Sequence, residues 1–316
     1  MSLPKVSVII PAAGNGEHLV DCLASVLALD YPDFETIVVD DGLSISARAV
    51  LDSFGGWLKI LESRSKGPSF ARNLAAGNTQ AELLAFTDSD CRVQKDWLRE
   101  LVKGLEGAPG AVACGGIQKL PHDAASFERK VFSFMRKVGF LTDYIKDSRN
   151  GGTISVKHNA SCNVMYRRDI FLQAGGFTES LWPGEDLELD LRLRRKGYNL
   201  VFNPQAVVYH YRPKNLRSFG RMMLRYGRAQ GLLVRKYGLF RRLHAAGFLT
   251  LSLVAVWIVL TVIYPTIGLG MLALAFIAAF IFCGLDPQIL ALFISATLNW
   301  HAGFTRGLLV YPISFA

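Results

Sequence analysis

The fold is decided by residues 6–42, VSVIIPAAGNGEHLVDCLASVLALDYPDFETIVVDDG, in which two kinds of apolar pattern alternate. The runs Val6–Ile10 and Phe34–Val39 are rich in β-branched residues, which is typical of buried strands. Between them, apolar residues recur at helical spacing from Leu19 to Leu27, and this predicts an amphipathic helix. The stretch therefore predicts a strand, a helix and a second strand in succession.

The same alternation continues further along the chain. Strand-like runs at Leu58–Leu61 and Glu82–Phe86 lie on either side of a helical stretch, Ser69–Asn78, and another helix is expected over Trp97–Leu105. Repeated units of this kind predict an α/β fold, with a mainly parallel sheet and helices on both faces. Ligands of such folds bind beyond the carboxyl ends of the strands, so polar residues at those ends are the candidate functional residues.

The chain of 316 residues is more apolar than an ordinary soluble protein, with 51% hydrophobic residues, 19% charged residues and a mean hydropathy of +0.26. This composition excludes intrinsic disorder. The five cysteines are scattered, odd in number and without a CxxC pair, which favours a reducing compartment. The first residues lack the apolar core and cleavage site of a secretory signal peptide, so none is expected.

The formal net charge of +9 comes from one segment of the chain. Residues 191–242 contain 14 of the 35 Lys and Arg residues and no Asp or Glu, whereas residues 1–190 contain 20 basic and 25 acidic side chains. Leu243–Leu285 then has no charged residue over 43 positions. Two membrane spans of about 20 residues each fit into this stretch, near Ala246–Tyr264 and Ile267–Leu285.

The uncharged stretch has one alternative interpretation, the buried helical hairpin of a soluble protein. A third apolar stretch, Ile289–Thr305, contains an Asn and a His, and whether it spans stays open. Because basic flanks stay cytoplasmic, we expect a multi-pass protein of the cell (inner) membrane whose catalytic part is cytoplasmic. Arginines and apolar residues mix over Leu216–Leu243, as in a helix lying among anionic lipid headgroups. Nucleic-acid binding is the rival interpretation of this segment and is not expected, since an adjacent membrane already explains the charge.

A glycine-rich turn, Gly14-Asn-Gly16, follows the first strand, and Asp40 and Asp41 end the second. The arrangement imitates a dinucleotide-binding fingerprint, but Leu19 occupies the place of the third glycine. Two interpretations stay open, a nicotinamide-binding loop and an ordinary strand-to-helix turn. In both of them, the two carboxylates can accept hydrogen bonds from a ribose or a base edge.

Two carboxylates, Asp88 and Asp90, follow the apolar strand that ends at Phe86. In extended geometry both side chains project to one side, and a cation relieves the repulsion between them. A hard divalent ion, Mg²⁺ or Mn²⁺, prefers such oxygen ligands and bridges to nucleotide phosphates. The alternative is a solvated turn, because Asp and Ser are common turn residues.

Further candidate residues lie at or near the ends of other predicted helices and strands. Glu185 and Asp186 open an amphipathic stretch, as acidic residues do at a helix N-terminus, and the functional alternative is a general base presented there. His210 follows the strand-like run Ala206–Tyr209 and is either a metal ligand or a surface histidine. Arg72, in the helix before the aspartate-bearing strand, is placed to meet a diphosphate.

Taken in order, these segments resemble family 2 glycosyltransferases of the GT-A fold, a Rossmann-like fold of nucleotide-diphospho-sugar transferases. The resemblance covers residues 5–212, and six motifs in order are more specific than any one of them. They are VSVIIP from Val6, IVVDDG from Ile37, ARN from Ala71, FTDSD from Phe86, NVMYRR from Asn163 with GGF from Gly175, and GED from Gly184.

The resemblance implies a donor site for a nucleotide sugar. Pro11 and Asp41, with Asp40 beside it, would hold the uridine part, and Arg72 would contact the diphosphate. The aromatic residue and the asparagine that the family carries after the first strand are replaced here by Ala and Gly.

The resemblance also implies a metal site and a catalytic pair. Asp88 and Asp90 match the DxD motif, in which Asp90 would bind the divalent metal, Mn²⁺ or Mg²⁺, and Asp88 the ribose or the sugar and metal. Asp186 matches the catalytic base, and Glu185 would support the acceptor or the sugar. His210 falls where related enzymes place a further metal ligand.

The chain departs from processive polysaccharide synthases. Their QxxRW motif is absent, because Met222–Tyr226 keeps only an Arg-aromatic pair, and we expect no span before the catalytic domain. A transferase that adds a single sugar is therefore expected. Residues 1–212 would form the GT-A catalytic domain, residues 213–244 a basic amphipathic interfacial segment, and residues 245–316 a membrane region with two or three helices.

The expected reaction is the inverting, metal-dependent transfer of a sugar from a nucleotide sugar, with UDP as the expected nucleotide. The expected acceptor is lipid-linked or membrane-proximal, for an envelope glycan or exopolysaccharide. A polyprenyl-phosphate sugar synthase is the first alternative. A membrane-tethered nicotinamide oxidoreductase and a nonenzymatic basic scaffold are the alternatives from other classes.

Overall fold

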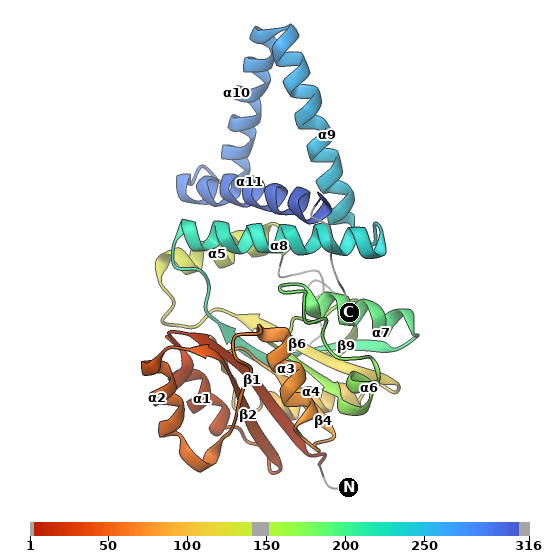
Figure 1. Ribbon diagram of the computed structural model, residues 1–316. Coiled ribbons are helices and arrows are strands. Elements are labelled where there is room, and N and C mark those ends of the chain that lie inside the picture. The colour runs from red at the N-terminus through yellow and green to blue at the C-terminus, as the bar shows by residue number, and fades with distance from the viewer. Residues whose placement is uncertain (1–2, 141–151, 310–316) are drawn as a thin grey trace. The chain divides into compact units, whose positions relative to one another are not determined.

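The computed structural model describes residues 3–140 and 152–309, which separate into two compact units (Figure 1). The first unit holds the described residues up to Ala124 and from Gly139 to Tyr211. The second unit holds Ala125–Val138 and the described residues from Arg212 onward.

The first unit is built on one mixed sheet. Its strands are β1 (Val6–Gly14), β2 (Phe34–Leu43), β3 (Lys59–Glu62), β4 (Leu83–Phe86), β5 (Cys91–Val93), β6 (Ala111–Lys119), β7 (Ile154–Ser155), β8 (Val164–Arg167) and β9 (Asn199–His210). Its helices are α1 (Leu19–Leu27), α2 (Ile45–Ser53), η1 (Gly55–Trp57), α3 (Pro68–Gly77), α4 (Trp97–Glu106), α6 (Arg168–Gln173) and α7 (Glu185–Arg195).

The sheet has the strand order β3-β2-β1-β4-β8-β6-β9-β5, with β7 paired to β9. The neighbours β3, β2, β1 and β4 are parallel, as the alternation of strands and helices predicts. Beyond them, β8 runs antiparallel to both β4 and β6, and β5 runs antiparallel to β9. A second parallel pair, β6 with β9, lies beyond β8. The sheet is therefore mixed and not mainly parallel, because the regular strand–helix alternation ends after α4.

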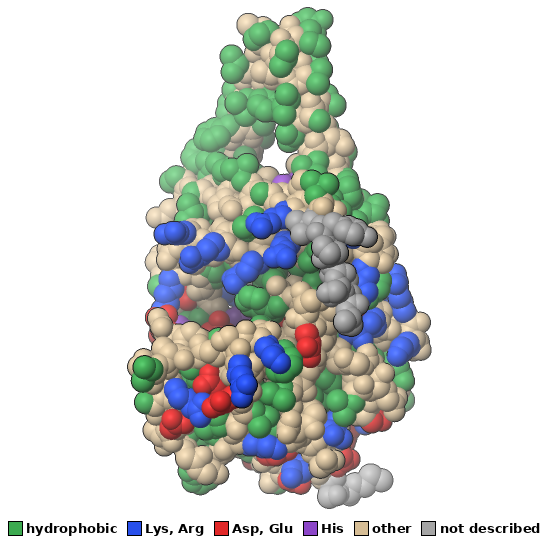
Figure 2. Space-filling view, in the orientation of Figure 1, with side chains coloured by type: hydrophobic (Ala, Val, Ile, Leu, Met, Phe, Trp, Pro, Cys, Tyr) green, Lys and Arg blue, Asp and Glu red, His purple; other side chains and the backbone are tan. Residues whose placement is uncertain are grey.

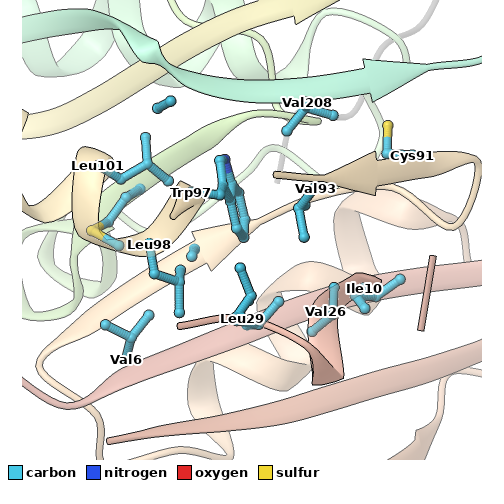
Figure 3. Close-up of a cluster of buried hydrophobic side chains, with 14 of the residues drawn as sticks. Val6, Ile10, Val26, Leu29, Cys91, Val93, Trp97, Leu98, Leu101 and Val208 are labelled. Atoms are coloured by element: carbon cyan, nitrogen blue, oxygen red, sulfur yellow. The ribbon is translucent and has the colours of Figure 1, made fainter. Parts of the chain in front are cut away.

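Both faces of the sheet are covered, because neighbouring residues on one strand point to opposite sides. Val8 and Ile10 of β1 belong to the core cluster that includes residues of α1 and α4, whereas Ile9 belongs to the cluster that includes residues of α3, α6 and α7. Figure 3 shows Trp97 of α4 within the first cluster. Its indole Nε1 donates to Asn163 Oδ1 at 2.8 Å and so ties the core to a loop of the candidate site.

The second unit is helical. It contains α5 (Ser126–Lys137), α8 (Leu216–Tyr237), α9 (Arg242–Ile263), α10 (Pro265–Phe282) and α11 (Pro287–Leu309). The helix α5 groups with this unit, although it lies in the chain segment that the sequence analysis assigns to the catalytic domain. An ion pair of 2.7 Å between Lys130 and Asp286 ties α5 to the turn before α11.

Two helices, α9 and α10, are long and apolar enough to cross a membrane, as judged by length and composition. They form a hairpin at the predicted position, with its turn at Tyr264 and Pro265. The third apolar stretch forms α11, which packs lengthwise against α8. On the face shown in Figure 2, the hairpin is covered by hydrophobic side chains.

Glycines let the backbones of α8 and α11 approach closely. A Cβ atom at Gly227 or Gly231 of α8 would collide with the carbonyl oxygen of Trp300 or Phe304 in α11. A Cβ at Gly303 of α11 would likewise collide with a carbonyl oxygen of α8. Close approach through small residues is how helices associate where water supplies no driving force.

Candidate active site

The two predicted metal-binding carboxylates lie in the turn between β4 and β5. The backbone N–H of Cys91 donates to the carbonyl of Asp88 at 3.0 Å and closes this turn. The expectation of extended geometry for Asp88 and Asp90 is therefore wrong, because the strand ends at Phe86. The turn nevertheless brings the two carboxylates together with His210, and one ligand atom from each lies within 4.8 Å of the others.

Pairing of β5 with β9 explains how His210 reaches this turn. Cys91 is the register partner of His210 in that antiparallel pair, and the His210 Nε2 lies 3.4 Å from Asp90 Oδ1. The side chains of Asp88, Asp90 and His210 are 27%, 51% and 18% exposed, so a ligand can reach them. Two carboxylates and an imidazole suit a divalent ion such as Mn²⁺ or Mg²⁺, with remaining positions open to phosphate oxygens.

Arg72 of α3 links this carboxylate cluster to the start of α7. Its Nη2 donates to Asp88 Oδ1 at 2.6 Å, and its Nη1 donates to Glu185 Oε1 at 2.8 Å. The guanidinium is only 2% exposed, and although burial lowers its pKa, the charges of Asp88 and Glu185 raise it well above its usual range. Both terminal nitrogens thus bind protein carboxylates, whereas the sequence pattern predicted a contact between Arg72 and a diphosphate.

Glu185 and Asp186 begin α7, directly after Gly184, whose φ of 104° lies in the left-handed region that glycine tolerates. Glu185 is buried, and burial together with the charge of Asp186 raises its pKa to about 7 against the opposing effect of Arg72. Asp186 is partly exposed. The pair therefore combines a buried carboxyl group with one that a ligand can reach.

Ser161, which sequence reasoning missed, holds this pair in place. Its backbone N–H donates to Asp186 Oδ2 at 2.9 Å, and its hydroxyl donates to Glu185 Oε1 at 3.1 Å. The other oxygen of Asp186 accepts the backbone N–H of Leu187 at 2.7 Å. No local pattern marks Ser161, because it acts across 24 and 25 residues of chain.

Two buried side chains anchor the loop that carries Ser161. The amide of Asn163 donates to the carbonyl oxygens of Ile117 and Ala206 at 2.9 and 3.0 Å. Asp190 of α7 is fully buried and accepts the backbone N–H of Asn159 at 2.7 Å. The loop is thus tied to the sheet on one side and to α7 on the other.

The residues expected to bind the nucleotide lie at the ends of β1 and β2. Pro11 is the register partner of Val39, and Asp41 Oδ1 accepts the Ser63 hydroxyl at 2.5 Å and the Gly67 N–H at 3.0 Å. These bonds fix Asp41 at the entry to α3.

Asp40 lies in β2, near the carboxyl end of that strand. It accepts the Leu43 N–H at 2.8 Å and pairs with Arg48 at 2.9 Å. Burial raises the pKa of this carboxyl group, but these hydrogen bonds outweigh burial and hold it below its usual value. Nearby, Gly14 pairs with Leu43 and the chain turns into α1, so the Gly14-Asn-Gly16 segment forms a strand-to-helix turn.

Comparison with known proteins adds an independent observation. Residues 7–174, more than half of the chain, match the family described as Glycosyl transferase family 2. The chain belongs to glycosyltransferase family 2. This membership sets aside the nicotinamide oxidoreductase and the nonenzymatic scaffold, since the chain is a glycosyltransferase.

Relatives of this glycosyltransferase include two proteins of Haloferax volcanii. Glycosyltransferase AglE is 28% identical over 240 residues, which cover 72% of this chain and 74% of AglE. Glucosyl-dolichyl phosphate glucuronosyltransferase is 26% identical over 219 residues, covering 65% of this chain and 69% of the relative.

A solved structure shows the fold of the glycosyltransferase. The mannosyltransferase PcManGT from Pyrobaculum calidifontis, in complex with GDP-Man and Mn²⁺, aligns with a TM-score of 0.71 at 16% identity. The alignment covers 98% of this chain and 88% of PcManGT. The predicted GT-A fold, followed by apolar C-terminal helices, is confirmed.

Proposed function

We propose that the glycosyltransferase performs an inverting, metal-dependent transfer from a nucleotide sugar to a lipid-linked acceptor. One observation carries this proposal. Arg72 bonds to Asp88 of the carboxylate cluster and to Glu185 beside Asp186, so a metal-binding set and an accessible general base are joined through one buried side chain.

Asp88, Asp90 and His210 would hold the divalent ion, Mn²⁺ or Mg²⁺. Their converging oxygen and nitrogen atoms support this assignment. So does the complex of PcManGT with Mn²⁺. The bound ion would act as a Lewis acid for the negative charge of the departing nucleoside diphosphate.

Asp186 would act as the general base. It removes the proton from an acceptor hydroxyl while that oxygen forms a bond to the anomeric carbon and the bond to the diphosphate breaks. Attack from the face opposite the leaving group inverts the configuration. Ser161 and Leu187 orient the Asp186 carboxylate through hydrogen bonds, and Glu185 supports the acceptor or the sugar.

Pro11, Asp40 and Asp41 would bind the nucleoside, and their position at the ends of β1 and β2 supports this role. In this proposal Arg72 holds Asp88 and Glu185 in position. UDP is the proposed nucleotide, and GDP is its first competitor because PcManGT was solved with GDP-Man.

Three observations support a membrane-associated acceptor. The helices α9 and α10 have the length and composition of membrane spans. The exposed face of α8 carries Arg217, Arg221 and Arg225, which suits anionic lipid. A relative is named for glucosyl-dolichyl phosphate, a lipid-linked sugar.

The proposed organisation places a cytoplasmic GT-A domain (residues 1–212) before an interfacial segment (213–244) and a multi-pass region (245–316) of the cell (inner) membrane. A polyprenyl monophosphate acceptor is the alternative. A phosphate nucleophile needs little help from a base, so strict dependence of the rate on Asp186 speaks against it.

The test is sugar transfer by the full chain in membranes. Labelled UDP- and GDP-sugars are supplied with Mn²⁺ or Mg²⁺ and with either polyprenyl-diphosphate-linked sugar or polyprenyl monophosphate. Transfer to the lipid-linked sugar that stops on chelation of the metal is the expected result. Transfer that persists without metal, or uses the monophosphate alone, contradicts the proposal.

A further inference from the structure

Two cysteines lie directly beside the carboxylate cluster. Cys91 begins β5 and Cys162 lies in the loop after Ser161, and both are buried. Together with His210 they form a second convergent group, in which one ligand atom from each residue lies within 4.8 Å of the others. The pairing of β5 with β9 sets Cys91 opposite His210, and Cys162 Sγ lies 3.7 Å from His210 Nδ1. Three separate chain segments thus bring two sulfur atoms and one ring nitrogen together.

His210 stands between these sulfur atoms and the carboxylates, with a different ring nitrogen toward each. Its Nε2 faces Asp90 Oδ1 at 3.4 Å. Its Nδ1 faces Cys162 Sγ, and also Gln118 Oε1 at 3.4 Å. One imidazole is therefore shared by an oxygen-rich group and a sulfur-rich group of ligands.

We propose that Cys91, Cys162 and the Nδ1 of His210 form a second metal site, for a thiophilic divalent cation such as Zn²⁺. Two sulfurs and one imidazole nitrogen are the ligands that zinc prefers, and a water molecule completes a tetrahedral set. Both cysteines bind as thiolates, so their two protons pass to solvent when the ion enters. Asp88 and Asp90 offer oxygen atoms, which suit Mn²⁺ or Mg²⁺ instead.

Sharing His210 sets the two sites in competition. A neutral imidazole has one nitrogen with a lone pair and one that carries hydrogen. When Nδ1 binds the thiophilic ion, Nε2 keeps its hydrogen and cannot serve the carboxylate site. Zinc at the cysteines therefore opposes Mn²⁺ at Asp88 and Asp90. This competition rests on the proposed function, whereas the cysteine site itself rests on the geometry alone.

Cadmium reports occupancy of the cysteine site, because a cadmium–thiolate bond gives an ultraviolet charge-transfer band. The full chain, reduced and freed of metal, is titrated with Cd²⁺ alone and then with Mn²⁺ and UDP. The variants are Cys91→Ser, Cys162→Ser and His210→Gln. Cys114→Ser is the matched control, because Cys114 is another buried cysteine of the same unit and lies in β6.

We expect one equivalent of Cd²⁺ to produce the band in the wild-type protein and in Cys114→Ser. Both site cysteine variants lose the band, His210→Gln weakens it, and Mn²⁺ with UDP displaces the ion from the wild type. Melting curves of the metal-free variants confirm that they remain folded. A variant that unfolds is replaced by its alanine counterpart.

Each of three results overturns a part of the proposal. A band that survives in folded Cys162→Ser, or one that disappears equally in Cys114→Ser, overturns the cysteine site. A wild-type band that Mn²⁺ with UDP leaves unchanged overturns the competition between the two sites. The Asp90→Asn variant separates failure of this proposal from failure of the proposed function. If it still transfers sugar at the full rate, the proposed Mn²⁺ site is wrong, whatever happens to the cadmium band.

Discussion

The two units of the molecule bury apolar side chains by different means. In the first unit, helices cover both faces of the sheet, so residues such as Ile9 and Ile10 are fully buried by protein. In the second unit, only 6% of the apolar window of α9, and likewise of α10, is buried. Exposed apolar surface of that extent is what a lipid environment covers. Burial by protein stabilises the first unit, whereas the hairpin of the second leaves most of its apolar side chains exposed.

The two units also differ in where their charged residues lie. In the first unit, the buried Arg72 is paired with Asp88 and Glu185. In the second unit, α9 between Leu243 and Ile263 and all of α10 contain no charged residue, and the arginines of α8 lie on an exposed face. Changes at the carboxylates should therefore affect chemistry, and changes in the helices should affect packing or lipid binding.

The largest expected effect is on catalysis. Asp186→Asn removes the proposed base without changing the size of the side chain, so the transfer rate should fall roughly 10²–10⁴-fold. Nucleotide affinity and membrane association should stay close to wild type, as measured by nucleotide-dependent melting shifts and by flotation with vesicles. Loss of nucleotide binding in this variant would point to a structural role instead.

Removal of the proposed metal ligand Asp90 should abolish the thermal stabilisation expected from Mn²⁺ with UDP. Asp90→Ala deletes an oxygen that the proposed ion needs. We therefore expect Mn²⁺ with UDP to raise the melting temperature of the wild type but not that of the variant. Glu17→Ala, a change at an exposed carboxylate of the same unit, serves as the control. Undiminished protection by Mn²⁺ in Asp90→Ala would contradict the metal assignment.

The pH dependence of stability should reveal the raised pKa of the buried Glu185 carboxyl group. Because the folded-state pKa of Glu185 is raised, its stabilising contribution is complete below the ordinary carboxyl pKa and is lost as pH rises through about 7. Between pH 5 and pH 8 the wild type should therefore lose more stability than Glu185→Gln, by up to roughly 3 kcal/mol. Thermal melts across this range give the comparison, and parallel curves for the two proteins would refute it.

Substitution of a glycine at the contact between α8 and α11 should disrupt helix packing in the second unit. Gly227→Val places a side chain against the carbonyl of Trp300, and overpacking of this kind costs about 1–3 kcal/mol. Gly270→Val is the matched control, because a Cβ there meets no atom within 4 Å. Protease resistance of α8 and α11 should fall only in Gly227→Val, and equal resistance of the two variants would contradict close packing.

The smallest expected effect is on lipid binding. Arg221→Gln removes one exposed charge from α8 and should weaken binding to anionic vesicles by about 1 kcal/mol, an effect that salt reduces. Lys103→Gln removes an exposed charge from the first unit and should leave binding unchanged. An equal decrease for both variants would show that net charge, and not α8, governs the attraction.

Local patterns predicted much of the fold. The seven strands and helices predicted between Val6 and Leu105 lie close to their expected positions, and the hairpin lies where the uncharged stretch placed it. The helix α2 and the short strand β5 in the same range were not predicted. Such elements are predictable because their apolar periodicity involves neighbouring residues. The position of β8 between β4 and β6 and the grouping of α5 with the C-terminal helices were not predicted, since both depend on distant partners.

The sequence by itself determined which residue types are available and where. It located the carboxylates at strand and helix ends, the basic segment and the apolar hairpin. Tertiary structure alone decided which of these side chains meet. Arg72 reaches Glu185 across 113 residues of chain, and the pairing of β5 with β9 brings His210 to both the carboxylates and the cysteines. The physical reason is that periodicity is a local property, whereas a binding site is made by contacts between segments that only the folded chain brings together.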